Sequence, residues 1–342
     1  MNKTAEKKNK GTKKGIKALR VICIILAVII CADIISVNWK SNPENIKNYN
    51  TTNPAIVDFH GGEKPMISAH RSGGGIMPEE SMMAFKNCVE NSSFSIDVFE
   101  FDLHITKDDV LVLLHDDTLD RTTDSLEVFG VEEAKPENYT YKELRQLNIG
   151  AKFETDDGET PYADLKGDDV PDDLKILRVE EILDYLMSKG DFNYIIEIKN
   201  GGDLGKKGVD ILYKILEERN LLDTVIFGTF KEEVSLYVDE NYPKLMRSAT
   251  IKEVLSFWKA ALTNDKDFKA NYVALQIPYN LPWRIAMNLG TEKIINYAHK
   301  HNIAVQYWTI NDEGQMKYLA SIGADCIMTD YPDVLYKAVY ES

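Results

Sequence analysis

The stretch Phe94–Arg121 reads FSIDVFEFDLHITKDDVLVLLHDDTLDR, and the rest of the chain is organised around it. Its first half sets acids among Phe, Val, Leu and Ile, which predicts a strand whose alternate residues share one face about 7 Å apart. Glu100 and Asp102 therefore point the same way, and the apolar residues beside them pack on the other side. Two adjacent carboxylates repel each other unless a positive charge lies between them. Because Ca2+ and Mg2+ bind oxygen ligands, the pair is a candidate metal site.

A second apolar run, Val110–Leu114, follows at once and leads to His115. We expect this run to be the hairpin partner of the first strand. A histidine at a strand end beside a metal-binding pair is an arrangement suited to hydrolysis. An exposed edge strand with solvated acids and a surface histidine explains the segment equally well, because exposed acids are common.

The charge of the chain is divided sharply along the sequence. The first twenty residues contain eight Lys or Arg and one Glu, a net charge of +7, whereas the whole chain carries −15, which leaves −22 on residues 21–342. This acidic body argues against nucleic acid as a partner, because phosphate backbones require a basic surface. It also argues against tight binding to anionic lipid headgroups.

An apolar segment follows the basic arm of residues 1–15. Val21–Ala32 is uninterrupted apolar sequence, and residues 16–37 make a stretch of about twenty residues because Lys17 and Arg20 can extend to the headgroups. No small-x-small cleavage site follows it. We predict one transmembrane signal anchor over residues 16–37, with a cleaved signal peptide as the alternative. Either way the basic arm stays in the cytosol and the body lies on the extracytoplasmic side of the cell membrane.

Residues 38–64 are polar and rich in Asn, which predicts a linker between membrane and domain. Residues 65–342 are long enough for one large hydrophobic core. This part of the chain contains only Cys88 and Cys326, which are too few for a disulfide framework and are expected in the core.

The body alternates strand and helix patterns. Helices are expected over residues 79–90, 176–189 and 204–219. Eight strand-like runs are separated mostly by helical stretches, and they are Met66–Ala69, Ile96–Ile105, Tyr194–Ile198, Val225–Phe227, Lys244–Met246, Tyr272–Leu275, Ile303–Tyr307 and Asp325–Met328. Eight alternating units in an α/β chain of this length predict a (β/α)8 TIM barrel, with a doubly wound open sheet as the structural alternative.

One region interrupts this alternation. Residues 124–175 contain few strand signals, and residues 154–175 hold nine acids against two lysines. We predict an insertion after the second strand, because an excursion this long in a compact domain is usually a functional lid or an insertion. The acids match no EF-hand spacing, so a solvated loop is favoured over a second cation site.

In a parallel barrel the functional residues lie at the carboxyl ends of the strands. Charged and titratable side chains stand at several of these predicted ends, namely His70, Arg71, Glu100, Asp102, His115, Glu197 and Lys199. Three carboxylates among them could hold one divalent cation, Ca2+ or Mg2+. The Arg and Lys could bind phosphate oxygens, and the two histidines could serve as acid and base. A phosphodiester fits this set better than an ester or amide, because no G-x-S-x-G nucleophile elbow is present.

Five segments carry a resemblance to a known family. They are AHRSGGGIMPEESMMAF (69–85), EFDLHITKDDVLVLLHDDTLDRTTD (100–124), IIEIK (195–199), YWTIN (307–311) and GADCIMTDYPD (323–333). In these segments the sequence resembles the glycerophosphodiester phosphodiesterases, and the E-x-D-x-x-x-T-x-D spacing followed by His-Asp is the most specific part.

The resemblance implies a TIM barrel with an insertion after its second strand. It implies a metal held by Glu100, Asp102 and Glu197, and His70 and His115 as the catalytic pair. His115 would protonate the leaving alcohol. The resemblance also places Arg71 and Lys199 at the phosphate, and we add Trp308 and Glu79 as possible pocket residues. The chain departs from the family pattern where Glu80 replaces an Asn and Ser72 replaces a Gly.

Three functions are carried forward. The first is metal-dependent hydrolysis of small glycerophosphodiesters to sn-glycerol 3-phosphate and an alcohol by a membrane-anchored enzyme. The second, on the same fold, is a lysophospholipase-D-like or polyglycerol-phosphate phosphodiesterase that acts on a lipid or an envelope polymer. The third is a membrane-anchored binding protein without catalysis, which predicts the loss of a catalytic residue that the sequence in fact retains.

Overall fold

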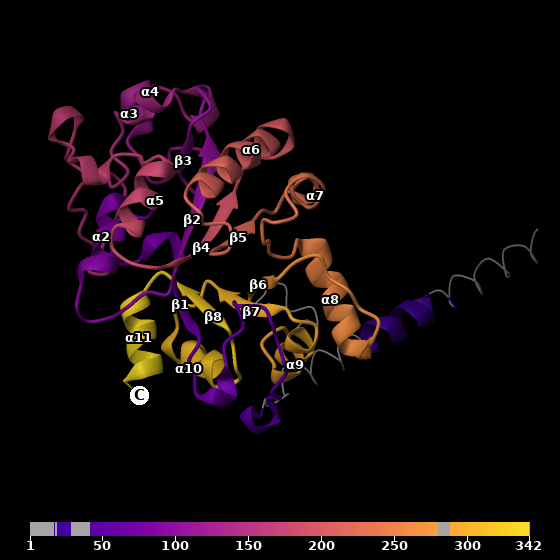
Figure 1. The fold of residues 1–342 in the computed structure, drawn as a ribbon. Coiled ribbons are helices and arrows are strands. Elements are labelled where there is room, and N and C mark those ends of the chain that lie inside the picture. Colours follow the sequence, from indigo (N-terminus) through magenta and orange to yellow (C-terminus); the bar gives the residue numbers. More distant parts are fainter. Residues whose placement is uncertain (1–16, 18, 29–41, 280–287, 342) are drawn as a thin grey trace, which may run out of the picture.

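The computed structural model describes residue 17 and residues 19–28, 42–279 and 288–341 (Figure 1). Parallel strands form a barrel-like sheet in the order β5-β4-β2-β1-β8-β7-β6. These strands are β1 (Met66–Ala69), β2 (Val98–Ile105), β4 (Asn193–Ile198), β5 (Val225–Gly228), β6 (Ala274–Pro278), β7 (Ala304–Trp308) and β8 (Cys326–Thr329). The predicted hairpin is confirmed, because β3 (Leu111–Leu113) pairs antiparallel with β2.

The eighth barrel position is filled without a regular strand. The strand predicted at residues 244–246 is absent, and two single bridges, Phe227 with Arg247 and Ser248 with Ala274, close the barrel between β5 and β6. The Ser248 amide donates to the Phe227 carbonyl at 2.9 Å. The extended segment is short because Thr250 already caps the following helix in a capping box with Glu253.

Helices surround the strands, as Figure 1 shows. They are α2 (Met82–Glu90), α3 (Ser125–Phe129), α4 (Tyr141–Leu144), α5 (Val179–Met187), α6 (Gly202–Glu218), α7 (Glu232–Asn241), α8 (Ile251–Thr263), α9 (Glu292–Lys300), α10 (Glu313–Ser321) and α11 (Pro332–Tyr340). The helix predicted from residue 79 begins only at Met82, because Ser81 caps it and Glu80 has a φ of 59° that no right-handed helix accommodates.

The main core lies between the strands and the surrounding helices, and its largest fully buried side chains include Phe85, Phe99, Phe101 and Phe227. Every residue of β2 is buried, although one of its faces is apolar and the other carries Glu100, Asp102 and His104. A smaller core fills the inside of the barrel with residues such as Val98, Ile195, Ala304 and Cys326. The α/β parallel barrel predicted from the alternation of elements is therefore the observed fold.

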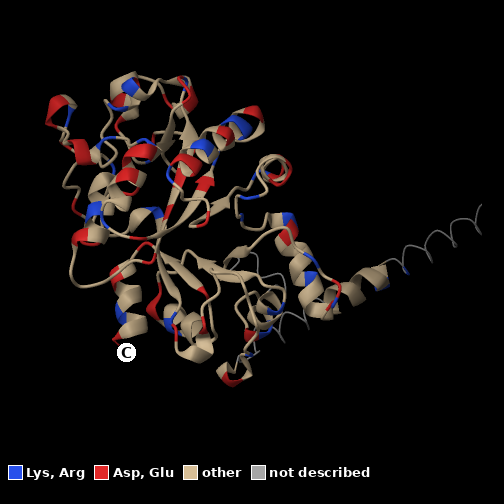
Figure 2. Cartoon of the chain, viewed as in Figure 1, with Lys and Arg blue, Asp and Glu red and all other residues tan. Residues whose placement is uncertain are grey.

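The predicted insertion forms a packed lobe beside the barrel. It contains α3, α4 and short 3-10 turns, and its own core joins Leu119, Leu144, Leu147 and Ile149 to Val112 of β3. Figure 2 marks acidic residues along the ribbon of this lobe, and the acids from Asp156 to Asp172 are exposed. The acid-rich segment is thus a charged surface on an ordered lobe.

Residues 42–64, predicted as a linker, lie against the barrel, and we call them the basal strap. Asn53 is 7% exposed, and its side-chain amide donates to the carbonyls of Val273 at 2.7 Å and Asn302 at 3.0 Å. The Val57 amide donates to Asp325 at 3.0 Å. Val273, Asn302 and Asp325 each come just before a strand, so the strap crosses the amino-terminal end of the barrel.

The structure describes only part of the predicted membrane anchor over residues 16–37. Residues 19–28 are helical, whereas the basic arm and residues 29–37 lie outside the described residues. Within the described part of the chain, no helix combines the length and the apolar character needed to cross a membrane.

Candidate active site

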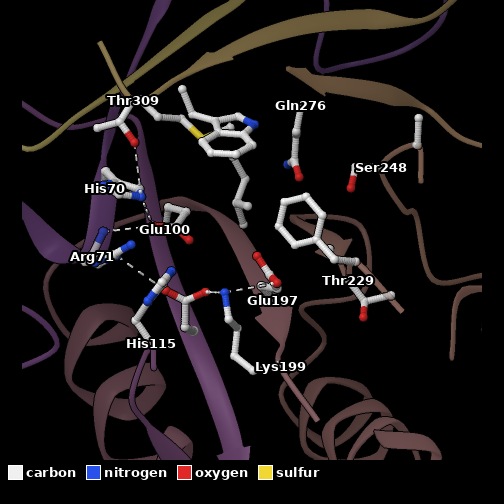
Figure 3. Close-up of a pocket in the computed structure, with 17 residues that line it drawn as sticks. His70, Arg71, Glu100, His115, Glu197, Lys199, Thr229, Ser248, Gln276 and Thr309 are labelled. Carbon is white, nitrogen blue, oxygen red and sulfur yellow. Dashed lines mark hydrogen bonds and ion pairs between the residues drawn. The ribbon is translucent and has the colours of Figure 1, made fainter. Parts of the chain in front are cut away.

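Side chains from the carboxyl ends of several strands converge on one cavity (Figure 3). Eight of the nine predicted site residues line it, namely His70, Arg71, Glu100, Asp102, His115, Glu197, Lys199 and Trp308. They come from the ends of four strands, β1, β2, β4 and β7, and from the β3 hairpin, and they are separated by up to 238 residues of sequence. The barrel therefore brings together residues that the sequence places on separate elements, as expected for the carboxyl face of this fold.

Three carboxylates form the floor of the cavity, two of them buried and the third, Glu197, partly exposed. Glu100 and Asp102 lie on β2, and Glu197 lies beside Asp102 on β4. Asp102 is 1% exposed, and its Oδ2 atom has no hydrogen-bond partner. Burial, followed by repulsion from Asp102, raises the pKa values of Glu100 and Glu197 to about 7. The cluster thus concentrates negative charge that needs a positive partner.

Lys199 supplies positive charge to this cluster. Its Nζ atom lies 3.4 Å from Asp102 Oδ1 and 3.2 Å from Glu197 Oε1, between the two acids. In the part of the chain that the structure describes, no three His, Cys, Asp or Glu side chains are grouped closely enough to hold a metal ion. The ammonium group occupies the space between two of the predicted ligands, which accounts for their separation.

His70 is fixed by a carboxylate on its outer side. Its Nδ1 atom lies 2.6 Å from Asp330 Oδ1, while its Nε2 atom faces Thr309 Oγ1 at 3.5 Å and Glu100 Oε2 at 4.0 Å. Burial disfavours the charged imidazole, but Glu100 and Asp330 outweigh burial and raise the pKa of His70. The hydrogen bond to Asp330 leaves Nε2 as the nitrogen directed to the cavity.

His115 is held in a similar way on another side of the cavity. Its Nδ1 atom lies 2.6 Å from Asp116 Oδ1, and Asp116 in turn accepts hydrogen bonds from the Arg121 guanidinium. Burial lowers the pKa of His115, and Lys199 adds to this effect. The two histidines therefore have pKa values shifted in opposite directions, which is typical of an acid and base pair.

Arg71 connects the two histidines. Its backbone amide donates to Glu100 at 2.8 Å, and its guanidinium lies 3.8 Å from Asp102 and 3.3 Å from Glu79. Its φ of 47° is in the left-handed region, which is uncommon for a residue with a side chain. Surrounding contacts hold this conformation, and they place both the amide and the side chain at the site.

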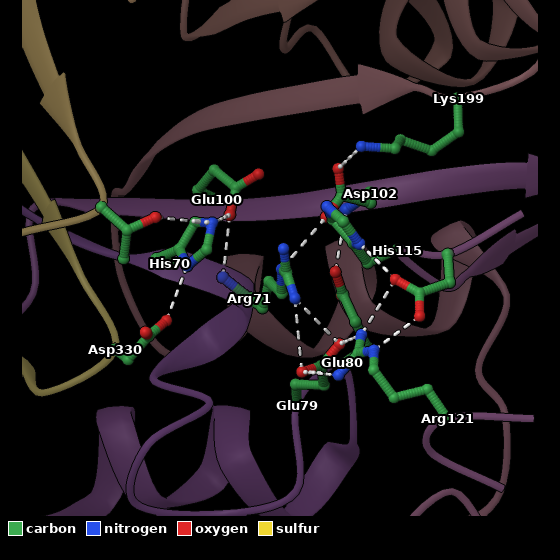
Figure 4. A network of polar contacts seen from close by, with 12 residues as sticks. His70, Arg71, Glu79, Glu80, Glu100, Asp102, His115, Arg121, Lys199 and Asp330 are labelled. Atoms are coloured by element: carbon green, nitrogen blue, oxygen red, sulfur yellow. Dashed lines mark hydrogen bonds and ion pairs between the residues drawn. The ribbon is translucent and has the colours of Figure 1, made fainter. Parts of the chain in front are cut away.

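Glu79, predicted as a pocket residue, does not line the cavity. It bridges Arg71 to Arg121, with Glu79 Oε1 2.6 Å from the Arg121 guanidinium (Figure 4). Arg121 thus binds two carboxylates at once, Glu79 and Asp116. The result is one polar network from His115 through Asp116, Arg121 and Glu79 to Arg71.

Two further titratable residues lie buried beside this network. Glu80 is 1% exposed and accepts a hydrogen bond from the Asp102 backbone amide at 3.0 Å. Burial, followed by the charge of Asp102, raises its pKa well above the ordinary value. His104 is 1% exposed within β2, where β3 pairs with it, and burial lowers its pKa to about 4.

The sequence analysis missed several members of the site. Three of them hydrogen-bond to predicted site residues or to each other outside the cavity, namely Asp330, Asp116 and Arg121. Five others complete the cavity wall, namely Thr229, Phe230, Ser248, Gln276 and Thr309. The cavity-wall residues follow or lie on β5, β6 and β7 or the bridge at Ser248. Their place at barrel strand ends was a usable signal, but neutral side chains do not stand out from the sequence.

Two histidines, three carboxylates and two basic side chains around one cavity of a parallel barrel are the arrangement of a phosphoric diester hydrolase. Comparison with known proteins agrees with this class. Residues 70–334 match the Glycerophosphoryl diester phosphodiesterase family. This match covers more than half of the sequence, so the chain belongs to that family.

Relatives with assigned names are distant but match along most of their length. The glycerophosphodiester phosphodiesterase of Bacillus subtilis is 26% identical over 282 residues, covering 80% of this chain and 86% of the relative. The protein of the same name from Caldanaerobacter subterraneus is 26% identical over 277 residues, covering 81% and 98%.

Solved structures share the fold at low identity. The phosphodiesterase of Oleispira antarctica, in complex with the product sn-glycerol-3-phosphate, superimposes with a TM-score of 0.60 at 20% identity, covering 80% of this chain and 96% of that one. The glycerophosphoryl diester phosphodiesterase domain of a Mycobacterium tuberculosis protein gives 0.64 at 16% identity, covering 80% and 99%.

Proposed function

We propose that this protein hydrolyses glycerophosphodiesters to sn-glycerol 3-phosphate and an alcohol. The observation that carries the proposal is the pair of histidines, each held at Nδ1 by a carboxylate beside Arg71 and Lys199. The names of the relatives, and the sn-glycerol-3-phosphate bound to one neighbour, support this substrate class. The acid cluster favours binding of a phosphate group through the two basic side chains rather than directly to the cavity floor.

The proposed roles follow from the hydrogen bonds of the histidines. His115 donates a proton from Nε2 to the leaving alcohol, and His70 accepts a proton from the attacking hydroxyl at its own Nε2. Asp116 and Asp330 orient the rings and stabilise the charge that each ring gains in turn. Arg71 and Lys199 hold the phosphate between the rings. Product analysis distinguishes attack by water from attack by the neighbouring glycerol hydroxyl, because only the second forms a cyclic phosphate.

Without a cation, the pKa of His70 is raised and that of His115 is lowered. These shifts oppose the assignment, because the proposed base His70 must start neutral and the proposed acid His115 must start protonated. Glu100 is the strongest of the groups that raise the pKa of His70. A cation that shares the charge of Glu100 weakens this effect and favours neutral His70. The proposed roles are therefore tied to cation binding.

We further propose that Glu100, Asp102 and Glu197 hold one divalent cation, Ca2+ or Mg2+. The donor set suits a hard cation, and Asp102 Oδ2 is a buried carboxylate oxygen without a hydrogen bond. When bound, the cation would polarise a phosphoryl oxygen. Lys199 Nζ has to leave the space between Asp102 and Glu197, and a substrate phosphate offers it a new partner.

The test is an assay of glycerol phosphate release from glycerophosphocholine, with Ca2+, Mg2+ or EDTA. The protein should begin no later than Asn42, because the basal strap belongs to the folded domain. Cation-dependent release that falls about 10²–10⁴-fold in His115→Ala is the expected result. His301→Ala is the matched control, because His301 lies outside the cavity, after α9. Release that survives both EDTA and His115→Ala contradicts the proposed site.

A lysolipid or an envelope polymer is the second candidate substrate. Phe230 lines the cavity with 48% of its surface exposed, and its ring packs edge-on at 5.9 Å against that of Trp308. This apolar corner could receive a larger alcohol group. A human protein named as a lysophospholipase D is 25% identical over 288 residues, covering 78% of this chain and 83% of the relative. The same assay with lysophosphatidylcholine and polyglycerol phosphate separates these substrates.

We propose as well that residues 16–37 anchor the protein in the cell membrane, with the barrel on the extracytoplasmic side. Residues 19–28 are helical and carry large apolar side chains that are each more than half exposed, namely Leu19, Val21, Ile22, Ile24, Ile25, Leu26 and Val28. Such a surface is stable where lipid covers it. Flotation of the full chain with lipid vesicles tests the anchor, and loss of flotation without residues 1–37 is expected.

A further inference from the structure

We propose that the outer face of α8 lies on the surface of a lipid bilayer, with its exposed apolar side chains between the lipid headgroups. The inference rests on the proposed anchor, which keeps the domain beside a membrane, and it is independent of the proposed hydrolysis. It assigns α8 the role of a second membrane contact, made by the flank of the barrel itself.

Four apolar side chains form one line along α8, and we call them the α8 stripe. Ile251 is 60% exposed, Leu255 is 49% exposed and Leu262 is 50% exposed. Trp258 is partly exposed. At 100° per residue, these four positions fall within about 60° of one another around the helix. The spacing therefore presents a continuous apolar surface over three turns.

The buried side of α8 does not explain this surface. Phe257, Ala260 and Ala261 face the core and are buried. The Phe257 ring is fully buried and packs against the rings of Phe268 and Tyr297, at 5.8 and 5.4 Å between centroids. The helix is thus apolar on two faces, and packing on the barrel accounts for only one of them.

The neighbouring helices carry fewer exposed apolar side chains. In the described part of the chain, α6 and α7 each have one large apolar residue of similar exposure, Leu204 and Leu236, and α9 and α10 have none. Lys252 of α8 lies 2.7 Å from Glu232 of α7. Leu236 comes one turn after Glu232, so it extends the α8 stripe toward α7. Single exposed apolar residues are ordinary, but a contiguous group of them marks an interaction surface.

The surroundings of the α8 stripe are basic in an acidic protein. Over the described residues 251–279 and 288–300, six lysines accompany four acids, a net charge of 6 − 4 = +2, whereas the whole chain carries −15. A groove beside the end of α8 is lined by five charged side chains, namely Lys47, Lys293, Lys300, Glu44 and Glu292. An apolar stripe with a tryptophan and with lysines beside it is typical of a helix that lies in a membrane interface.

The basal strap begins beside α8. The Lys47 amide donates to the Asn296 side chain at 2.8 Å, and that side chain donates to the Asn45 carbonyl at 2.8 Å. Asn296 belongs to α9. Asn45 also lines the groove together with Ala261 and Asn264, at the end of α8. The part of the strap that is nearest to the anchor in sequence therefore lies on the same side of the domain as the α8 stripe.

A bilayer fits this surface better than a second copy of the chain. A symmetric contact between two copies through the stripe would place the same lysines opposite one another. A bilayer supplies phosphate groups to these lysines instead. The anchor also keeps the stripe at a high effective concentration of lipid, so a weak contact is sufficient. The acidic remainder of the domain agrees with a contact that is weak without the anchor.

The α8 stripe runs along the side of the barrel, and Figure 1 shows α8 on its outside. Ser248 and Ala249, just before α8, line the cavity, whereas Ala261 and Asn264 line the groove beside the basal strap. The helix thus extends from the cavity end of the barrel toward the strap. A bilayer that contacts the whole stripe lies against this flank, and neither end of the barrel faces it.

The direct test is spin labelling of the full chain in vesicles of phosphatidylcholine and phosphatidylglycerol. Single labels are placed on the stripe by Leu255→Cys or Leu262→Cys. The matched control is Leu126→Cys on α3, a leucine that is 52% exposed and that lies far from α8 in Figure 1. The background is Cys23→Ser, Cys31→Ser, and the two remaining cysteines, Cys88 and Cys326, are buried.

The measured quantity is the ratio of label collisions with oxygen, which concentrates in lipid, to collisions with a water-soluble nickel chelate. We expect this ratio to be about threefold or more higher at both stripe positions than at position 126. Equal ratios at the three positions overturn the proposal. A second copy on the stripe would lower collisions with both reagents and broaden the spectra through contact between labels, and this result also overturns it.

A charge placed on the stripe tests whether the stripe makes the contact. Leu262→Glu, in the chain labelled at position 255, should lower the ratio there to that of position 126, because a carboxylate is unfavourable among acyl chains. Leu126→Glu is the matched control and should leave the ratio unchanged. Both leucines are about half exposed, so little loss of stability is expected, and thermal unfolding checks this. An unchanged ratio in Leu262→Glu overturns the proposal.

Hydrolysis in the same vesicles separates this inference from the proposed function. Leu262→Glu lies outside the cavity and should cleave added glycerophosphocholine at the native rate. Failure of every chain to cleave it overturns the proposed function alone, because the labels still report the membrane contact. A native chain that fails to float with the vesicles overturns the inference together with the anchor, and leaves the proposed hydrolysis untouched.

Discussion

Each end of the barrel contains a buried aspartate, and the two aspartates differ in their hydrogen-bond partners. At the base, Asp325 is fully buried and accepts from the amides of Val57 and Val305 and from His299. At the cavity, Asp102 is 1% exposed, lies among other acids and has one oxygen without a hydrogen bond. The first carboxylate ties three elements together. The second has Lys199 at 3.4 Å and Arg71 at 3.8 Å, but its Oδ2 atom has no hydrogen bond and is available to a ligand.

The backbone shows the same contrast. Arg71, Ser72 and Glu80, beside the cavity, have φ values of 47°, 61° and 59°. In the basal strap and the strands that it contacts, only Gly62 has a positive φ. A glycine adopts this backbone conformation without strain. The difference teaches that this fold concentrates its strained backbone and its crowded carboxylates at the cavity end, and that the base supplies stability.

The largest effect should come from exchanging a histidine at each end. His70→Asn removes the proposed base and should lower kcat about 10²–10⁴-fold while the melting temperature hardly changes. His299→Asn, at the base, should leave kcat unchanged. Steady-state assays and thermal unfolding of both variants check the comparison. A large loss of kcat in His299→Asn would contradict the assignment of catalysis to the cavity end and of stability to the base.

Replacing Arg121 should have the next largest effect on kcat, because Arg121 hydrogen-bonds to both Asp116 and Glu79 without lining the cavity. Arg121→Ala frees the partners of His115 and Arg71, and kcat should fall about 10–100-fold, as expected for displaced supporting groups. Arg121→Lys should recover little of this, because one ammonium group cannot bind two carboxylates as a planar fork. Unchanged kcat in Arg121→Ala would show that the network does not position the catalytic groups.

A moderate effect on stability is expected at the base. Asp325→Asn weakens hydrogen bonds to a buried charged group and should cost about 2–3 kcal/mol, with a melting temperature about 4–8 °C lower. The kcat on soluble substrate, measured well below the transition, should be unchanged. Asp333→Asn is the control, because its carboxylate lies on α11 away from the basal strap. A loss of kcat without a loss of stability would place Asp325 in the catalytic machinery.

The smallest effect concerns pH and the site acids. Folding raises the pKa values of Glu100 and Glu197 from about 4.5 to about 7, so the folded protein binds more protons than the unfolded chain between these values. Stability without a cation should therefore fall as pH rises from about 4.5 to 7, and be lowest above 7. Added Ca2+ or Mg2+ should raise the melting temperature by about 2–4 °C at pH 7.5 and less at pH 5.5. Thermal unfolding in EDTA checks this sign, and a cation effect that is larger at low pH would contradict it.

How far the sequence predicts the site depends on the type of residue. The acids two apart on β2, the histidines at strand ends and the Glu197 and Lys199 pair were all recognised, because a charged residue inside or after an apolar run is conspicuous. Neutral wall residues such as Ser248 and Gln276 were missed. Glu79 was placed in the pocket, but the structure uses it to join two arginines.

The sequence alone determined the elements and the chemistry of their ends. Strand alternation acts between neighbours, so β1, β2 and the β3 hairpin could be predicted within two residues of their observed bounds. The residue types at the strand ends also identified a phosphodiesterase-like set. These features depend on side chains close together in the chain, where local propensity and pattern are sufficient.

Only the tertiary structure decided which distant residues complete each end. His70 meets Asp330 across 260 positions, and Asn53 meets Asn302 across 249. Lys199 lies between two of the predicted ligands, and isolated bridges close the barrel where a strand was expected. Such pairs form because burial forces each polar group to find a partner within the packed fold, and that partner is set by three-dimensional packing rather than by any local pattern.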